Sequence, residues 1–273
     1  MDTQNFLYLP KKFHNKHRYC EFVITQIEQL LLDEQFSELR KQTIHFTKPI
    51  NSIEKGIDLV ELLEKRGMHL ERQIISRNIM LNSLIIDTCY FIQEGLVCSL
   101  KMRLSVTLTL FRKPFLETLL VIMRIITEND FMHKFINHEG LDPINITSTG
   151  KKKLISDTNY LLNMGYPEEA LFKFIYDKDY ESSLLNISNR AIHLYTNRNE
   201  KNMTGKENLN FIFSGKDDIE NIWKYIYSTL PLLLTFLADT VDFATEQCTS
   251  VQQEIFLDRV IERRKMQKKY RAY

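Results

Sequence analysis

Apolar residues recur at helical spacing over long stretches of this chain, and few residues interrupt the pattern. The longest stretch runs from His69 to about Leu100. The 273 residues include only 8 Gly and 6 Pro, whereas an all-β fold needs a turn every dozen residues or so. We therefore expect an all-α protein, a single multi-helix bundle domain of about nine to eleven helices.

Changes in pattern divide the chain into three parts. Residues 1–68 are expected to form an N-terminal arm and helical extension, in which residues 1–18 are irregular. Residues 69–247 should form the central helical bundle, and residues 248–273 a C-terminal basic helix. Apart from residues 104–126, helical spacing predicts helices over about 19–41, 52–66, 69–100, 130–138, 151–163, 167–176, 179–196, 217–247 and 250–270.

Residues 104–126 are apolar on most faces, which is typical of a helix at the centre of a bundle. The β-branched residues among 105–110 also suit a strand, but the length of the segment favours a helix. Pro114 either kinks this helix or lies in the first turn of a new one. We expect this segment to be the most buried element of the fold.

Charged and polar residues interrupt two of the apolar segments. Arg112 and Glu117 lie within residues 104–126, and Ser188, Asn189, Arg190 and His193 lie near the end of another helix. Burying an unpaired charge is costly. We therefore expect Arg112, Glu117 and His193 to line one polar cleft, supported by Ser188 and Asn189. The alternatives are a buried ion pair that sets helix register and a histidine that satisfies carbonyls at a helix end.

The order of these motifs resembles the HEPN-type helical domains of bacteria, including those of phage-defence and toxin–antitoxin loci. The resemblance covers about residues 70–247 and rests on an internal Leu-Phe-Arg-x-x-x-x-Glu helix followed by a Ser/Asn–apolar–His helix end. The usual signature of the family is Arg, four to six residues, then His, whereas here only two residues separate Arg190 from His193.

The resemblance implies a metal-independent ribonuclease without cofactors that works as a homodimer. His193 would be the base, and Arg190 or Arg198 would bind phosphate. Histidine suits proton transfer near neutral pH, and the guanidinium fork suits a phosphate. The short spacing between Arg190 and His193 favours the alternative of a non-catalytic helical module that binds or regulates a protein. Candidate partners are RNA, a second copy of the chain, and a protein such as an antitoxin.

Composition argues against several other classes of protein. The 36 Lys and Arg nearly balance the 35 Asp and Glu, so a generally basic surface is not expected. No secretory signal, bilayer-length apolar run or Cys-x-x-Cys pair is visible, and we expect a cytoplasmic protein without a membrane partner. Phosphate-loop and dinucleotide-binding motifs are missing, and no metal site is expected. The basic run at 151–153 is best interpreted as solvated surface. The run at 263–271 either reaches nucleic acid or is the basic end of a soluble final helix, where it complements the helix dipole.

Overall fold

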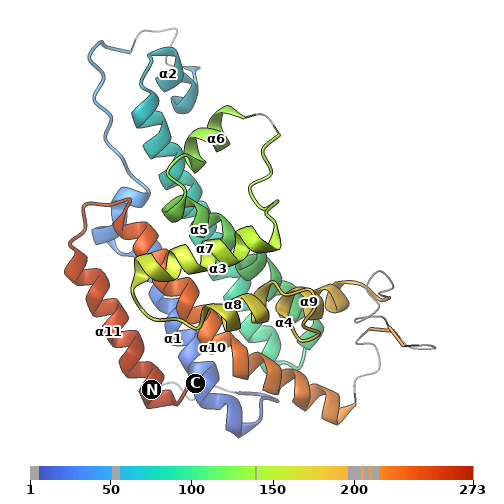
Figure 1. Cartoon of the computed structure of the whole chain (residues 1–273). Coiled ribbons are helices and arrows are strands. Elements are labelled where there is room, and N and C mark those ends of the chain that lie inside the picture. The colour runs from blue at the N-terminus through green and yellow to red at the C-terminus, as the bar shows by residue number, and fades with distance from the viewer. Residues whose placement is uncertain are drawn as a thin grey trace.

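The computed structural model describes residues 6–50, 56–138, 140–195, 204–205, 209–210 and 215–272. Over these residues it contains eleven α-helices and no strand, which confirms the predicted all-α fold (Figure 1). The helices are α1 (Lys11–Leu32), α2 (Leu59–Lys65), α3 (His69–Leu100), α4 (Leu104–Lys113), α5 (Leu119–Thr127), α6 (Phe131–Asn137), α7 (Ser148–Leu162), α8 (Glu168–Ile175), α9 (Leu184–Ile192), α10 (Lys216–Glu246) and α11 (Gln253–Tyr270).

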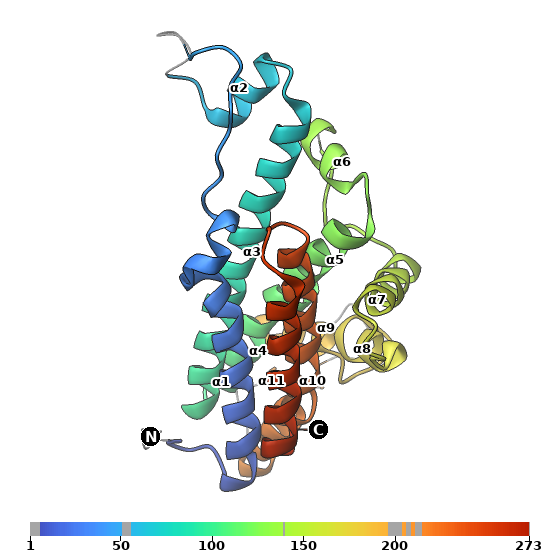
Figure 2. The same ribbon diagram turned by 90° about the vertical axis from the view of Figure 1, so that its left-hand side faces the viewer.

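The long helices α1, α3, α10 and α11 lie alongside one another, some of them antiparallel, and form the body of the molecule (Figures 1 and 2). Helix α1 packs against α10, α3 and α11, and its buried residues belong to the same apolar core as those of α10. It begins at Lys11, so the prediction of an irregular arm over residues 1–18 was wrong for 11–18. Phe13 and His17 are buried there against Tyr227 of α10. A segment with so many basic residues lacks an obvious apolar period, although its inner face is buried.

The remainder of the N-terminal part lies away from the body of the bundle. After α1 the chain makes a short 3₁₀ helix, Glu34–Leu39, in place of further α-helix. Helix α2 then packs beside the first half of α3, at the top of Figure 1. It is shorter than the helix predicted over 52–66, and its N-cap is Asp58, whose side chain accepts a hydrogen bond from the Val60 N–H. The predicted cap, Ser52, lies outside the described residues.

The apolar segment at 104–126 forms two α-helices joined by one π-helical turn, Pro114–Thr118. Pro114 lacks an N–H and cannot continue the regular α-helical hydrogen bonding, which accounts for the wider turn. Phe115, Leu119 and Leu120 are fully buried, as is the middle of α10 around Phe236. The two segments together therefore form the centre of the fold.

Helix α11 is attached to the bundle by buried charges, not only by apolar contacts. Arg263 is completely buried and donates hydrogen bonds to Asp239 and Asp242 of α10 and to Gln26 of α1. Arg259 pairs with Asp242 in the same layer. Within the basic run at 263–271, Arg263 is therefore a core residue, because α10 supplies carboxylates that the local sequence does not reveal.

Two helices are long and apolar enough to cross a bilayer by length and composition, namely α3 and α10. The most apolar stretch of α10 is 83% buried inside the protein, whereas the most apolar stretch of α3 is 44% buried. Such burial is expected of a core helix, and the apolar character of α10 is accounted for by its neighbours α1, α5 and α11.

Candidate functional site

Arg112 joins two helices that are far apart in the sequence. It lies in the last turn of α4, and its Nη1 donates hydrogen bonds to Ser188 Oγ (3.2 Å) and Asn189 Oδ1 (2.7 Å) of α9. Ser188 is fully buried, whereas Arg112 and Asn189 are half-buried. The predicted association of Arg112 with Ser188 and Asn189 is thus present, because α4 and α9 pack side by side.

Glu117 lies in the π-helical turn that follows α4 and is half-buried. Burial lowers the pKa of Arg112, while the nearby charge of Glu117 acts in the opposite direction. The two side chains form no ion pair, and Glu117 has no hydrogen bond in the described part of the chain. The guanidinium of Arg112 is therefore held by two neutral oxygen atoms, which leaves its positive charge uncompensated by direct contact with a carboxylate.

His193 follows the last residue of α9 and is exposed to solvent. Its backbone N–H donates to Asn189 O (3.0 Å), and its backbone carbonyl accepts from Asn210 Nδ2 (2.7 Å). Among the residues that the structure describes, the imidazole itself has no hydrogen-bond or ion-pair partner. Arg112, Glu117 and His193 therefore do not form one hydrogen-bonded cluster, and it is the backbone of His193, not its ring, that caps the helix.

Arg190 lies in the last turn of α9 and is half-buried. Its guanidinium makes two long contacts, both of 3.4 Å, with the carboxylate and the backbone carbonyl of Glu181. Its Nε is buried without a hydrogen-bond partner. A cation in this last turn is also favoured by the helix dipole. Arg198, the other predicted phosphate ligand, lies outside the described residues.

Three apolar side chains, Ile192, Leu194 and Tyr195, surround His193 in the sequence and are all exposed. Clustered exposed apolar residues commonly mark a contact with another molecule. The end of α9 thus combines a solvent-accessible imidazole, a partly buried arginine and an apolar surface.

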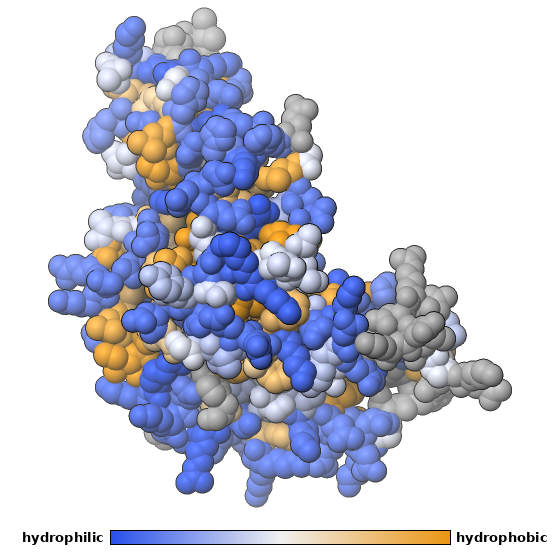
Figure 3. Space-filling model, in the orientation of Figure 1, coloured by the Kyte–Doolittle hydropathy of each residue, from blue (hydrophilic) through white to orange (hydrophobic). Residues whose placement is uncertain are grey.

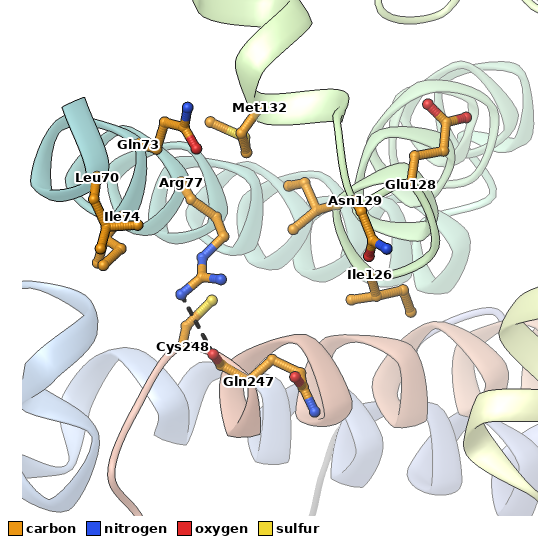
Figure 4. A pocket seen from close by; sticks show the side chains of 11 residues that line it. Leu70, Gln73, Ile74, Arg77, Ile126, Glu128, Asn129, Met132, Gln247 and Cys248 are labelled. Atoms are coloured by element: carbon orange, nitrogen blue, oxygen red, sulfur yellow. Dashed lines mark hydrogen bonds between the residues drawn. The ribbon is translucent and has the colours of Figure 1, made fainter.

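Sequence reasoning did not reveal the cavities of the fold, because separate elements form their walls. One cavity of about 250 Å³ lies between α3, α5, α6 and the turn after α10 (Figure 4). Arg77 crosses it and donates to Gln247 O at 3.3 Å, while its Nε is buried without a partner. A second cavity of about 620 Å³ lies between the loop at residues 41–45 and α3, and its lining includes Asn78 and Cys248. Its position between a loop and α3 left no periodic signal in the sequence.

Within the described residues, no group of three or more His, Cys, Asp or Glu side chains is arranged to hold a metal ion. Comparison of the chain with models of protein families, with curated proteins and with solved structures found no match.

Proposed function

We propose that the chain is a HEPN-like, metal-independent ribonuclease whose cleavage site lies at the C-terminal end of α9. The observation that carries the proposal is the solvent-exposed imidazole of His193, which has no partner within the described residues and follows Arg190 by three residues. His193 comes directly after α9, and its backbone N–H still bonds to Asn189 O, so the two residues lie about one turn apart at the same helix end. The hydrogen bonds of Arg112 to Ser188 and Asn189 support the proposal, because they anchor the turn of α9 that precedes this pair.

The proposed reaction needs only a base and a cation. His193 takes the proton of a ribose 2′-hydroxyl, O2′ attacks the adjacent phosphorus, and the bond to O5′ breaks. The proton is returned to O5′, which leaves a 2′,3′-cyclic phosphate and a 5′-hydroxyl. Arg190 binds the phosphate oxygens as their negative charge increases. Its long contacts with Glu181 are weak by hydrogen-bond standards, so the guanidinium is available to a stronger acceptor.

A second copy of the chain would complete this site. The exposed Ile192, Leu194 and Tyr195 supply an apolar contact surface next to His193. A homodimer formed there brings two imidazoles and two arginines toward one strand of RNA. A non-catalytic module that uses this surface for a protein partner is the second candidate, favoured by the two-residue spacing between Arg190 and His193 and by the existing contact of Arg190 with Glu181.

The test is cleavage of labelled single-stranded RNA by the purified full chain in the presence of EDTA. His193→Ala should lower the cleavage rate roughly 10²–10⁴-fold, as expected for loss of a general base. His133→Ala, at another exposed histidine on α6, is the matched control and should leave the rate unchanged. Arg190→Gln should also lower the rate, and the product should carry a cyclic phosphate.

Equal cleavage by the wild type and by His193→Ala would exclude the ribonuclease assignment to this site. The second candidate would be supported if the wild type cleaves no RNA but forms a stable complex with a protein partner, and the Leu194→Gln variant loses that complex. Circular dichroism of each variant tests whether a loss is due to unfolding, which is not expected for the exposed His193.

A further inference from the structure

Three segments that are distant in the sequence meet at one end of the bundle. Helices α1 and α11 run antiparallel, because Gln26 of α1 bonds with Arg263, whereas Phe36, which follows α1, contacts Phe256 at the start of α11 (Figure 2). The start of α1 therefore lies beside the end of α11, at the lower end of Figures 1 and 2 where both termini are marked. The turn between α3 and α4 joins them, since the Tyr8 N–H donates to Leu100 O (3.2 Å).

All three segments are basic and free of acidic residues. Residues 6–20, 95–109 and 263–272 contain no Asp or Glu. Their exposed cations include Lys11, Arg18, Lys101, Arg103, Lys268 and Arg271, which we call the basic end. Among the described residues none of these six forms an ion pair, and the chain as a whole has a net charge of only +1. The start of α10 lies at the same end, where Glu220 pairs with Lys12 and Trp223 donates to Ser99 O, so the six cations are an excess of positive charge beyond that ion pair.

Exposed apolar side chains occur on two turns within the basic end. Leu7 is 50% exposed and Tyr8 63%, and Met102, between Lys101 and Arg103, is 42% exposed. The hydrogen bond between Tyr8 and Leu100 brings the two turns together. In Figure 3 this lower end is mostly hydrophilic on the face in view.

We infer that the basic end binds the anionic surface of a lipid bilayer. Lys and Arg near such a surface attract acidic headgroups, at about 1 kcal/mol for each cation. Leu7, Tyr8 and Met102 enter the boundary between headgroups and acyl chains, where apolar and tyrosine side chains are stabilised. Lys101 and Arg103 extend their aliphatic stems past Met102 and place their charges among the phosphates. A nucleic acid would bind the cations but would not bury the exposed apolar side chains of Leu7 and Met102. A lipid surface therefore accounts for both the cations and the apolar side chains of the basic end.

The experiment is sedimentation of the full chain with vesicles of phosphatidylcholine alone and with vesicles containing about one third phosphatidylglycerol. Binding should be seen with the anionic vesicles and should decrease as salt is added. The double variant Lys101→Gln/Arg103→Gln should bind them roughly thirty-fold more weakly, since two cations contribute about 1 kcal/mol each. Leu7→Gln/Met102→Gln should also weaken binding while leaving its salt dependence in place.

Matched controls lie elsewhere on the surface. Lys152→Gln/Lys153→Gln removes two cations on α7, and Leu257→Gln/Ile261→Gln removes two exposed apolar side chains on α11. Both should bind anionic vesicles like the wild type. The inference is overturned if the wild type binds neither vesicle, if it binds both equally, or if the control variants lose as much affinity as the test variants. Binding of a single-stranded RNA through Lys101 and Arg103, without binding of vesicles, would assign the basic end to nucleic acid instead.

Discussion

Replacing Arg263 with Met tests whether buried charges attach α11 to the bundle. Arg263 donates to Asp239 Oδ1 (2.8 Å), Asp242 Oδ2 (2.5 Å) and Gln26 Oε1 (3.0 Å). Burial by itself lowers the pKa of Arg263, but the charges and hydrogen bonds of Asp242 and Asp239 outweigh it and raise the pKa above its usual value. Arg263 is therefore charged at any pH at which the protein is folded.

The expected loss follows from what remains after Arg263→Met. Breaking a buried pair by removing one partner costs about 3–5 kcal/mol, because the other charge stays buried. Here Asp239 keeps Arg264 and Asp242 keeps Arg259, so neither carboxylate is left without a cation. We therefore expect the lower value, about 3 kcal/mol. For a chain of this size that corresponds to a fall in Tm of about 6–12 °C.

The assay is urea unfolding followed by circular dichroism, with the matched variant Lys153→Met. Lys153 forms an exposed ion pair with Asp157 on α7, and its loss should cost less than about 1 kcal/mol. The double variant Arg263→Met/Asp242→Asn should lose less than the sum of the two single losses, because the residues are in contact. A loss below about 1 kcal/mol for Arg263→Met, or strict additivity with Asp242→Asn, would refute the reasoning.

Two further predictions concern the core. Gly95→Ala should destabilise the protein by about 1–3 kcal/mol, since the added Cβ would lie 2.4 Å from Cε1 of Phe111. Urea unfolding measures the loss, and adding Phe111→Leu to the Gly95→Ala variant should recover part of it. No recovery would mean that the strain does not come from Phe111. Burial raises the pKa of the Cys89 thiol to about 12 and also raises the pKa of Cys248, so the thiolate fraction at pH 8 is small. Iodoacetamide should modify half-buried Cys248 before buried Cys89 in the native protein, as read by peptide mass spectrometry, and the reverse order would contradict the described burial.

Local periodicity was sufficient to predict the class of fold and most helices. The apolar spacing over 69–100 predicted α3 with the same limits that the structure has. It failed at the start of α1, where most side chains are polar and only a few inner positions are buried. It also missed the 3₁₀ helix Glu34–Leu39 and the short extent of α2, because helices of six or seven residues depend on their neighbours and caps more than on their own period.

For the candidate site, the cost of burying charge predicted that Arg112, Glu117 and His193 line one cleft, with a buried ion pair as an alternative. In the structure Arg112 bonds instead to the neutral side chains of Ser188 and Asn189, and within the described residues it forms no ion pair with the half-buried Glu117. The same argument placed the ring of His193 in the cluster, whereas the end of α9 turns it toward solvent.

The amino-acid sequence by itself determined which segments are helical and which faces are apolar, because these depend on residues three and four apart. Only the tertiary structure decided which distant charges meet. Arg263 is buried against Asp239 and Asp242, while Lys268 and Arg271, a few residues further along the same basic run, remain exposed. The physical reason is that the free energy of a charge depends on its burial and its partners, and both are set by the packing of α1, α10 and α11.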